Sequence, residues 1–198
     1  MKRSLIIVIL SVLSGCGPLI PIPGESPKRF NLSAIPVEQR AQPSPLQLIV
    51  DIPTTSVFLD TQRVAVVPAP QQIDYFANME WAERLQLVVQ ESVTYSLQNL
   101  NLFRAVTRQN DGIIPDRQLK INIRKFQVNL CTQPIAEAEY YVQLINVISR
   151  DEVARYTFTT SIPMSAESTP SAEDIAAALD QANKNIIGEI ADWLKKYL

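Results

Sequence analysis

The 198-residue chain contains no histidine, and this absence excludes several classes of enzyme at once. Histidine is the commonest general base in enzymes and the commonest metal ligand in proteins. Without it, the chain cannot be a Ser-His-Asp hydrolase, a zinc enzyme with histidine ligands, or a haem protein with a histidine axial ligand. Any catalytic activity would have to use other groups.

Glycine is also scarce, and none of the five glycines has the spacing of a phosphate-binding loop, so the chain is not an ATPase. It also lacks a Gly-x-Ser-x-Gly nucleophile motif and a cluster of metal-ligand type. Carboxylate pairs at Glu137/Glu139 and Glu173/Asp174 fall on an outward strand face and in a first helical turn, which favours solvated surface over an acid/base pair. We therefore interpret the protein as a non-enzyme without catalytic, cofactor-binding or metal-binding residues.

The net charge excludes a further class of protein, and the length indicates the number of domains. The 18 basic and 20 acidic residues give a net charge of −2, so there is no basic excess that would bind nucleic acid. With 46% hydrophobic residues the chain can form a core, and its length fits one domain with a tail.

The amino terminus is typical of a secreted protein. Lys2 and Arg3 precede an apolar run of about ten residues, which is too short to span a bilayer as a mature helix. The run ends in a tetrapeptide that resembles the lipobox of bacterial lipoproteins, formed by Leu13, Ser14, Gly15 and Cys16.

That resemblance implies that a signal peptidase recognises Leu13, Ser14 and Gly15 and cleaves before Cys16. Cys16 would then carry a diacylglycerol on its thiol and an acyl chain on its new amino group. The alternative is an ordinary signal peptide with Cys16 near its cleavage site by chance. We prefer lipidation because the charge, the apolar run and the tetrapeptide agree. In bacterial lipoproteins, an Asp directly after the lipidated cysteine favours the inner membrane. This chain has Gly17 at that position, which favours the outer membrane.

The second cysteine has no partner within the chain if Cys16 carries lipid, so no internal disulfide is expected. We interpret Cys131 as a small buried apolar residue rather than a reactive thiol.

Proline marks a tether between the anchor and the domain. Half of the 14 prolines lie between residues 18 and 45, and this density favours extended, semi-rigid chain. We predict a signal peptide over 1–15, the lipidated cysteine and tether over 16–45, and a folded domain over 46–198. A short strand over 28–32 could still join the sheet.

The predicted fold is α+β, with two long helices packed on one face of a twisted, mostly antiparallel sheet. An apolar stripe that includes Trp81 predicts a helix from Met79, and a second helix begins at Ser171 as its N-cap. A switch of apolar parity at Arg124-Lys125 predicts a β-bulge. The predicted strands cover residues 46–52, 63–67, 73–76, 102–106, 119–130, 136–144 and 154–162, with a turn over 146–152.

The aromatic residues suggest core positions and one exposed site. We interpret Trp81 and Trp193 as core anchors on the two helices, with contact to lipid or another ligand as the alternative. Tyr140 and Tyr141 are adjacent in a predicted strand, so they face opposite sides of the sheet. One of them can be core, and the other would lie on the helix-free face, where a partner could bind.

The order of these segments is similar to that of the ABC-type transport auxiliary lipoprotein family, over about residues 28–197. The similarity is carried by the lipobox, the tether, the strand over 63–68 and the run 73–85, in which Trp81, Ala82 and Glu83 form the most specific motif. Further matches are 103–106, the Asp111-Gly112 turn, 119–126, 136–139 and 177–182. These are structural signatures without a catalytic residue.

The resemblance implies a non-catalytic periplasmic component of a system that moves phospholipid or other apolar cargo between membranes. Its partners would be a protein with a mammalian-cell-entry domain and an ABC permease with its ATPase. A homo-oligomeric ring at one membrane is also compatible with it. Two other functions stay open, namely an envelope assembly or structural lipoprotein, and a carrier that holds lipid in its own cavity.

Overall fold

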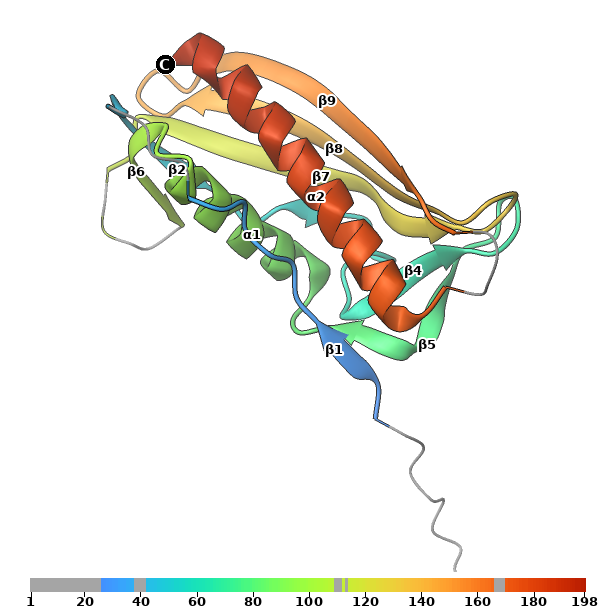
Figure 1. The fold of residues 1–198 in the computed structure, drawn as a ribbon. Coiled ribbons are helices and arrows are strands. Elements are labelled where there is room, and N and C mark those ends of the chain that lie inside the picture. Colours follow the sequence, from blue (N-terminus) through green and yellow to red (C-terminus); the bar gives the residue numbers. More distant parts are fainter. Residues whose placement is uncertain (1–25, 38–41, 109–111, 113, 166–169) are drawn as a thin grey trace, which may run out of the picture.

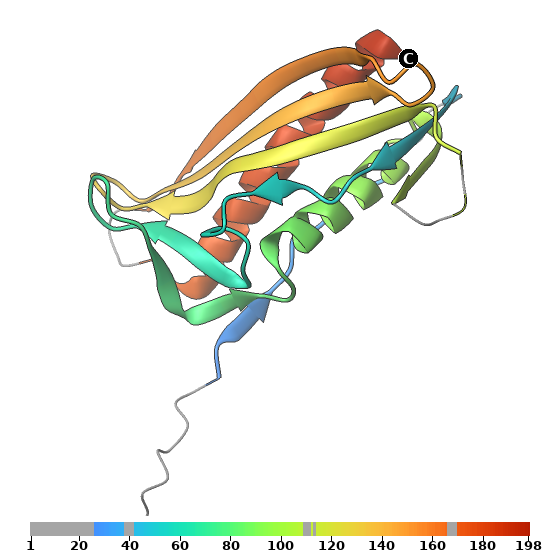
Figure 2. The same ribbon diagram turned by 180° about the vertical axis from the view of Figure 1, so that it is seen from behind.

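The structure is a computed structural model, and it describes residues 26–37, 42–108, 112, 114–165 and 170–198. The lipobox, Cys16 and much of the predicted tether lie outside the described residues. The described chain forms two layers, a twisted sheet of nine strands and two helices that lie on one face of it (Figure 1). Figure 2 shows the opposite face, which neither helix covers. This confirms the predicted α+β fold.

Strand β7 (Arg117–Asn129) is the centre of the sheet. Along one edge it pairs antiparallel with β8 (Ile135–Asn146), which pairs antiparallel with β9 (Glu152–Pro163). The β7–β8 register shifts between Ile123 and Lys125, so the predicted bulge is present. These two antiparallel ladders are the longest in the sheet.

The other edge of β7 has a topology that strand periodicity did not reveal. Three short strands pair with it in parallel, namely β2 (Ser44–Val50), β3 (Thr54–Thr55) and β4 (Arg63–Val67). Further strands extend the sheet beyond them. β5 (Asp74–Trp81) pairs antiparallel with β4, and β1 (Lys28–Phe30) pairs in parallel with β5. β6 (Phe103–Arg108) pairs in parallel with β2. The sheet is therefore mixed, with its longest ladders antiparallel.

Helix α1 (Leu85–Asn99) packs on β6 and β2, whereas α2 (Ala172–Leu194) packs across β7, β8 and β9 and continues into a 3₁₀ turn at Lys195–Tyr197. The prediction of a helix from Met79 was wrong, because α1 begins six residues later. Met79 and Trp81 are buried on alternate positions of β5, and the four-residue step from Trp81 to Leu85 spans a turn.

The folded domain also begins earlier than the predicted boundary at residue 46. The short strand expected within the tether is present as β1, and Leu32 just after it is buried in the core. Prolines at positions 27 and 36 flank this stretch rather than interrupt it, so β1 can pair with β5.

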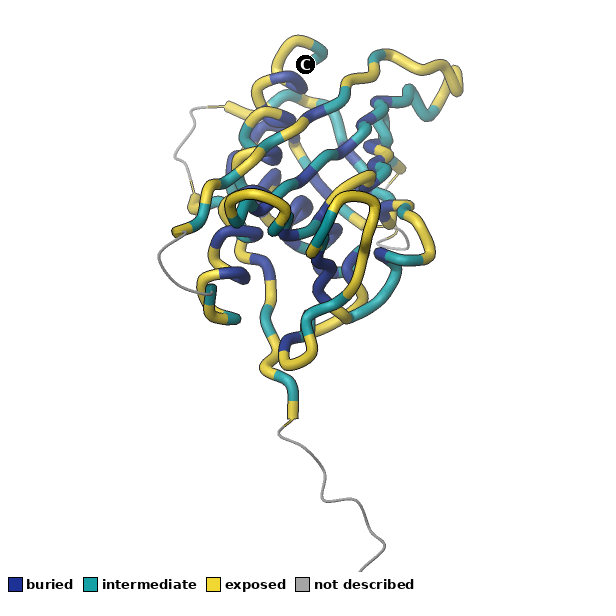
Figure 3. Tube along the Cα trace, turned by 90° about the vertical axis from the view of Figure 1, so that its right-hand side faces the viewer, coloured by how far each residue is buried: buried dark blue, intermediate teal, exposed yellow. Residues whose placement is uncertain are grey.

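The core lies between the helices and the sheet, where the buried stretches gather in Figure 3. Three large side chains form its centre, since the ring of Phe126 lies 5.6 Å from that of Trp81 and 6.2 Å from that of Tyr140. Trp193 is buried as well. Both tryptophans are therefore core residues, although Trp81 reaches the core from a strand and not from a helix.

One predicted buried position is exposed. Cys131 lies in the turn between β7 and β8, where its N–H donates to Oδ1 of Asn129, so its interpretation as a buried residue was wrong. Tyr156 lies two positions before the buried Phe158 on β9, yet it is 56% exposed.

The start of α2 follows the sequence prediction in detail. Ser171 accepts a hydrogen bond from the N–H of Asp174, and the Asp174 carboxylate accepts one from the N–H of Ser171, which completes a capping box. Hydrogen bonds from the Ser171 hydroxyl and backbone hold the pKa of Asp174 below its ordinary value.

Replacing this cap gives a first prediction. Ser171→Ala is expected to lower the free energy of unfolding by about 1 kcal/mol, because it leaves an N–H of the first turn without its partner. Since the pKa of Asp174 is depressed in the folded state, its stabilising effect exists at neutral pH and is lost as the pH falls through the folded pKa. Urea unfolding at pH 7 and pH 3 should show a smaller difference between parent and variant at pH 3. An equal difference at both values would contradict the role of the Asp174 carboxylate.

Candidate functional site

The motif Trp81-Ala82-Glu83 forms a joint between β5 and α1. The N–H of Trp81 donates to the carbonyl of Gln62 at 2.6 Å, and the N–H of Ala82 donates to the carbonyl of Phe30 at 2.7 Å. Glu83 is exposed. The motif therefore ties β1 and the start of β4 to the beginning of α1, and its role in the described structure is architectural.

Residues 28–37, here called the strap, lie along the space between the two helices (Figure 1). On the α2 side, the N–H and the hydroxyl of Ser33 each donate to the carboxylate of Asp180 at 2.7 Å. On the α1 side, the hydroxyl of Ser92 donates to the carbonyl of Ser33 at 2.9 Å. One residue of the strap thus connects both helices.

The strap is held further along as well. The N–H of Ile35 donates to the hydroxyl of Ser96 at 3.0 Å, and the amide of Asn99 donates to the carbonyl of Ile35 at 2.7 Å. The apolar side chain of Leu32 is buried. The N–H and the carbonyl of Ile35 therefore both find partners on α1.

A buried polar chain links the strap to the middle of the sheet. The hydroxyl of Tyr140 donates to Oδ1 of Asn183 at 3.0 Å, and Nδ2 of Asn183 donates to the hydroxyl of Ser92 at 2.8 Å. Burial raises the pKa of Tyr140 well above its ordinary value, so its hydroxyl stays protonated and can donate. Because an unpaired polar group is costly at such depth, these hydrogen bonds fix how the strap, the helices and the sheet fit together.

At its other end the strap reaches the first turn of α2. The ammonium group of Lys28 lies 2.8 Å from the carboxylate of Glu173, and this hydrogen bond holds the pKa of Glu173 below its ordinary value. Both side chains are largely exposed, so the pair contributes little to stability.

The strap gives a second prediction. Asp180→Asn is expected to raise the hydrogen-exchange rate of the Ser33 amide about tenfold, because a charged acceptor of two hydrogen bonds becomes a neutral one. Asp192→Asn, an exposed change on the same helix, is the matched control and should leave this amide unchanged. Hydrogen exchange is measured by NMR on the full chain. Equal exchange rates of the Ser33 amide in the two variants would contradict the role of the hydrogen bonds between Ser33 and Asp180.

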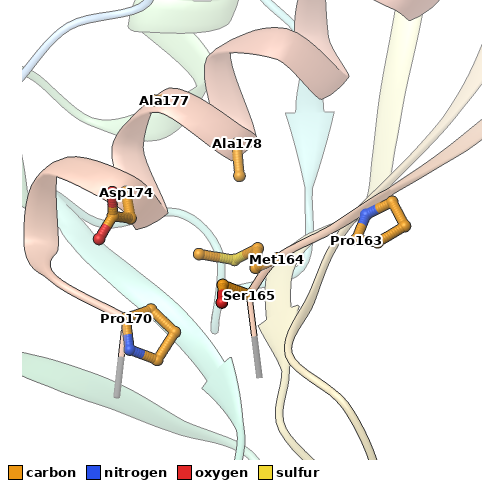
Figure 4. A pocket seen from close by; sticks show the side chains of 7 residues that line it. All are labelled: Pro163, Met164, Ser165, Pro170, Asp174, Ala177 and Ala178. Atoms are coloured by element: carbon orange, nitrogen blue, oxygen red, sulfur yellow. The ribbon is translucent and has the colours of Figure 1, made fainter. Parts of the chain in front are cut away.

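The two larger of the surface hollows beside α2 lie at its opposite ends. One, of about 270 Å³, lies between the end of β9 and the start of α2 and is shown in Figure 4. Its lining is mostly apolar, and the carboxylate of Asp174 is already engaged in the helix cap. It therefore offers little chemistry for binding a ligand.

The other hollow, here called the aromatic cleft, has a volume of about 490 Å³ and lies between β9 and the end of α2. Four aromatic rings in consecutive contact form its wall, with centroids 4.8, 5.9 and 5.3 Å apart: Tyr156, Phe158, Trp193 and Tyr197. Charges of both signs surround it, on Arg155, Glu189, Asp192 and Lys196. Such an arrangement suits an apolar side chain within a polar surrounding.

Tyr141 lies on the helix-free face, as predicted, while Tyr140 is core. The guanidinium of Arg124 lies over the Tyr141 ring, 4.7 Å from its centroid, and Glu139 pairs with both Arg124 and Lys125. This face is polar and internally paired rather than apolar.

Within the described ranges there is no group of three or more histidine, cysteine, aspartate or glutamate residues that could hold a metal. No helix there is long and apolar enough to cross a membrane.

The model of the ABC-type transport auxiliary lipoprotein component family matches residues 30–191. This span includes most of the strap, the Trp81-Ala82-Glu83 joint and almost all of α2. The chain belongs to this family. The family is described as an auxiliary lipoprotein component of ABC-type transport.

Solved structures show the same fold. A Xanthomonas campestris protein of the DUF330 family is 23% identical, with a TM-score of 0.74 over 85% of this lipoprotein and 95% of that chain. The protein CT253 of Chlamydia trachomatis is 8% identical, with a TM-score of 0.52 over 78% of this lipoprotein and 98% of that chain.

A curated relative, an uncharacterized protein of Bradyrhizobium diazoefficiens, is 27% identical over 146 residues. The match covers 74% of this lipoprotein but 38% of the relative's length.

The structure brings together Trp81, Ala82 and Glu83, but Leu13, Ser14, Gly15 and Cys16 lie outside the described residues. Sequence reasoning missed the hydrogen bonds that hold Ser33 between Asp180 of α2 and Ser92 of α1. A signal for them was present, because Ser92, Ser96 and Asn183 occupy buried helix positions where apolar residues would be usual.

Proposed function

We propose that this lipoprotein is a non-catalytic adaptor that faces the periplasm and is held at a membrane by lipid on Cys16. Its partners would be a protein with a mammalian-cell-entry domain and an ABC permease with its ATPase. The system would move phospholipid or another apolar compound between membranes. Membership of the family supports the link to ABC transport. The observation that carries the adaptor role is the strap, because it joins the tether rigidly to both helices.

The strap determines from which end of the domain the tether would leave. Twelve peptide steps separate Cys16 from Lys28, so the start of the strap can lie at most about 43 Å from the lipidated residue. Because the strap is fastened between the helices, the end of the domain that carries β1 would face the anchoring membrane. The opposite end, which carries the carboxyl terminus in Figure 1, would face partners. The lack of Asp after Cys16 favours the outer membrane as the site of anchoring.

The packing favours an adaptor over a carrier. A carrier would hold lipid between the helices and the sheet, but Trp81, Phe126 and Tyr140 fill this space. Lipid that co-purifies in stoichiometric amounts with a soluble Cys16→Ala protein would support the carrier instead.

A binding measurement with purified components tests the adaptor role. The full-length lipoprotein in nanodiscs should bind the periplasmic part of the mammalian-cell-entry protein with a Kd in the micromolar range or below, as expected for a specific protein–protein interface. Nanodiscs without the lipoprotein are the control. Failure to bind at about 100 μM, together with binding to an outer-membrane barrel protein, would favour the assembly lipoprotein and overturn the proposal.

A further inference from the structure

The edges of the described sheet differ in how they are protected. An unpaired strand edge attracts other strands, and proteins protect such edges by shortness or by charge. β1 has three residues and carries Lys28 and Arg29, and β3 has two residues. β6 has six residues and carries Arg104 and Arg108. Each of these edges is therefore poorly suited to accept a further strand.

Strand β9 has charged residues near its beginning and Pro163 at its end, but it lacks such protection over residues 156–162. It has twelve residues, and its two charged residues, Glu152 and Arg155, both lie near its beginning. Residues 156–162 contain no charge, proline or glycine, and β-branched or aromatic side chains make up most of them. Residues of this kind favour extended pairing. Among the described residues only β8 pairs with β9, so the outer row of backbone donors and acceptors is free to bind an extended peptide.

The aromatic cleft adjoins this edge. Tyr156 and Phe158 belong to β9 and line the cleft together with Trp193 of α2, whose ring packs against that of Phe158. A strand added beside β9 would place alternate side chains on the side of the sheet that carries the cleft. An apolar side chain could then enter the cleft, while polar neighbours reach the charged residues around it. The backbone edge would supply affinity and the cleft would supply specificity.

We propose that β9 accepts an extended segment of a partner protein over residues 156–162, with one apolar side chain of that segment in the aromatic cleft. The identity of the partner as a subunit of the transport system rests on the proposed function. The cleft lies at the end of the domain opposite β1 (Figure 1), hence away from the end where the chain leads to the anchor. An extended partner segment can reach it there from the periplasm.

Crosslinking in cells tests the pairing directly. The full lipidated chain carries benzoylphenylalanine at position 157, 159 or 161, one at a time, and at Arg104 on the β6 edge as the control. Pairing predicts that the three β9 positions crosslink to one partner segment, at partner residues that advance by two for each step of two. Crosslinks to a second copy of this chain, to scattered residues, or at the level of the Arg104 control would overturn the proposal.

A substitution adds an independent test. Thr159→Lys places a charge on the exposed edge and is expected to lower the crosslink yield from position 161 at least tenfold. Thr107→Lys on β6 is the matched control and should leave that yield unchanged. Both variants should keep the urea midpoint of the parent, since each position is on an outer strand. An unchanged yield in a folded Thr159→Lys protein would overturn the pairing.

The two proposals can fail separately. If the lipoprotein binds the mammalian-cell-entry protein while positions 157, 159 and 161 give no stepped crosslinks, the adaptor stands and the pairing at β9 falls. If stepped crosslinks lead to a protein outside any transport system, the pairing stands and the adaptor falls.

Discussion

Trp81→Ala is expected to lower the free energy of unfolding by about 3–5 kcal/mol, as measured by equilibrium urea unfolding. The side chain is 1% exposed and its ring packs against Phe126, so truncation removes buried apolar surface and leaves a cavity at the centre of the core. Trp81 also lies in the joint that holds β1 and α1. The loss should therefore extend to the strap, with faster hydrogen exchange at Ser33.

The matched control for Trp81 is Tyr156→Ala. Tyr156 is also aromatic and also lies on a strand, but its side chain is more than half exposed. Its truncation should change the free energy of unfolding by less than about 1 kcal/mol. A Trp81→Ala protein as stable as its parent but unable to bind its partner would show that Trp81 acts at an interface and not in the core.

Cys16→Ala is expected to abolish acyl labelling and to release the domain from the membrane fraction. Three acyl chains hold a protein at a membrane almost irreversibly, whereas the domain itself is acidic and has no helix in the described ranges that could span a bilayer. Labelled fatty acid followed by membrane fractionation measures both effects.

Cys131→Ala is the control for the anchor, since it removes the other cysteine from an exposed turn. It should keep both the label and the membrane attachment. If the Cys16→Ala protein still incorporates labelled fatty acid, the lipobox interpretation is wrong.

Local sequence patterns predicted the second half of the chain well. The parity switch at Arg124-Lys125 and the cap at Ser171 each depend on neighbours in sequence, and both are present. The start of α1 was predicted wrongly because Trp81 and Leu85 fit a helical spacing across a strand and a turn. The parallel pairings of β2, β3 and β4 depend on how distant segments meet, which periodicity does not encode.

The candidate site was predicted only in part. The Trp81-Ala82-Glu83 motif was found because it resembles the family. Its hydrogen bond to Phe30 could be recognised only from the folded structure. The proline-rich composition predicted a tether and concealed the strap, because the clamp on Ser33 consists of hydrogen bonds to residues more than 50 positions away. The protection of edge strands also emerged only once the order of strands was known.

The central claim is that this auxiliary lipoprotein joins a membrane to an ABC-type transport system. The most direct measurement is mild crosslinking in cells, purification of the lipidated chain and quantitative mass spectrometry, with the Cys16→Ala strain as the comparison. The account predicts that a mammalian-cell-entry protein and its permease are enriched with the lipidated chain at least tenfold over that strain. Enrichment of outer-membrane barrel proteins without any component of a transport system would contradict it.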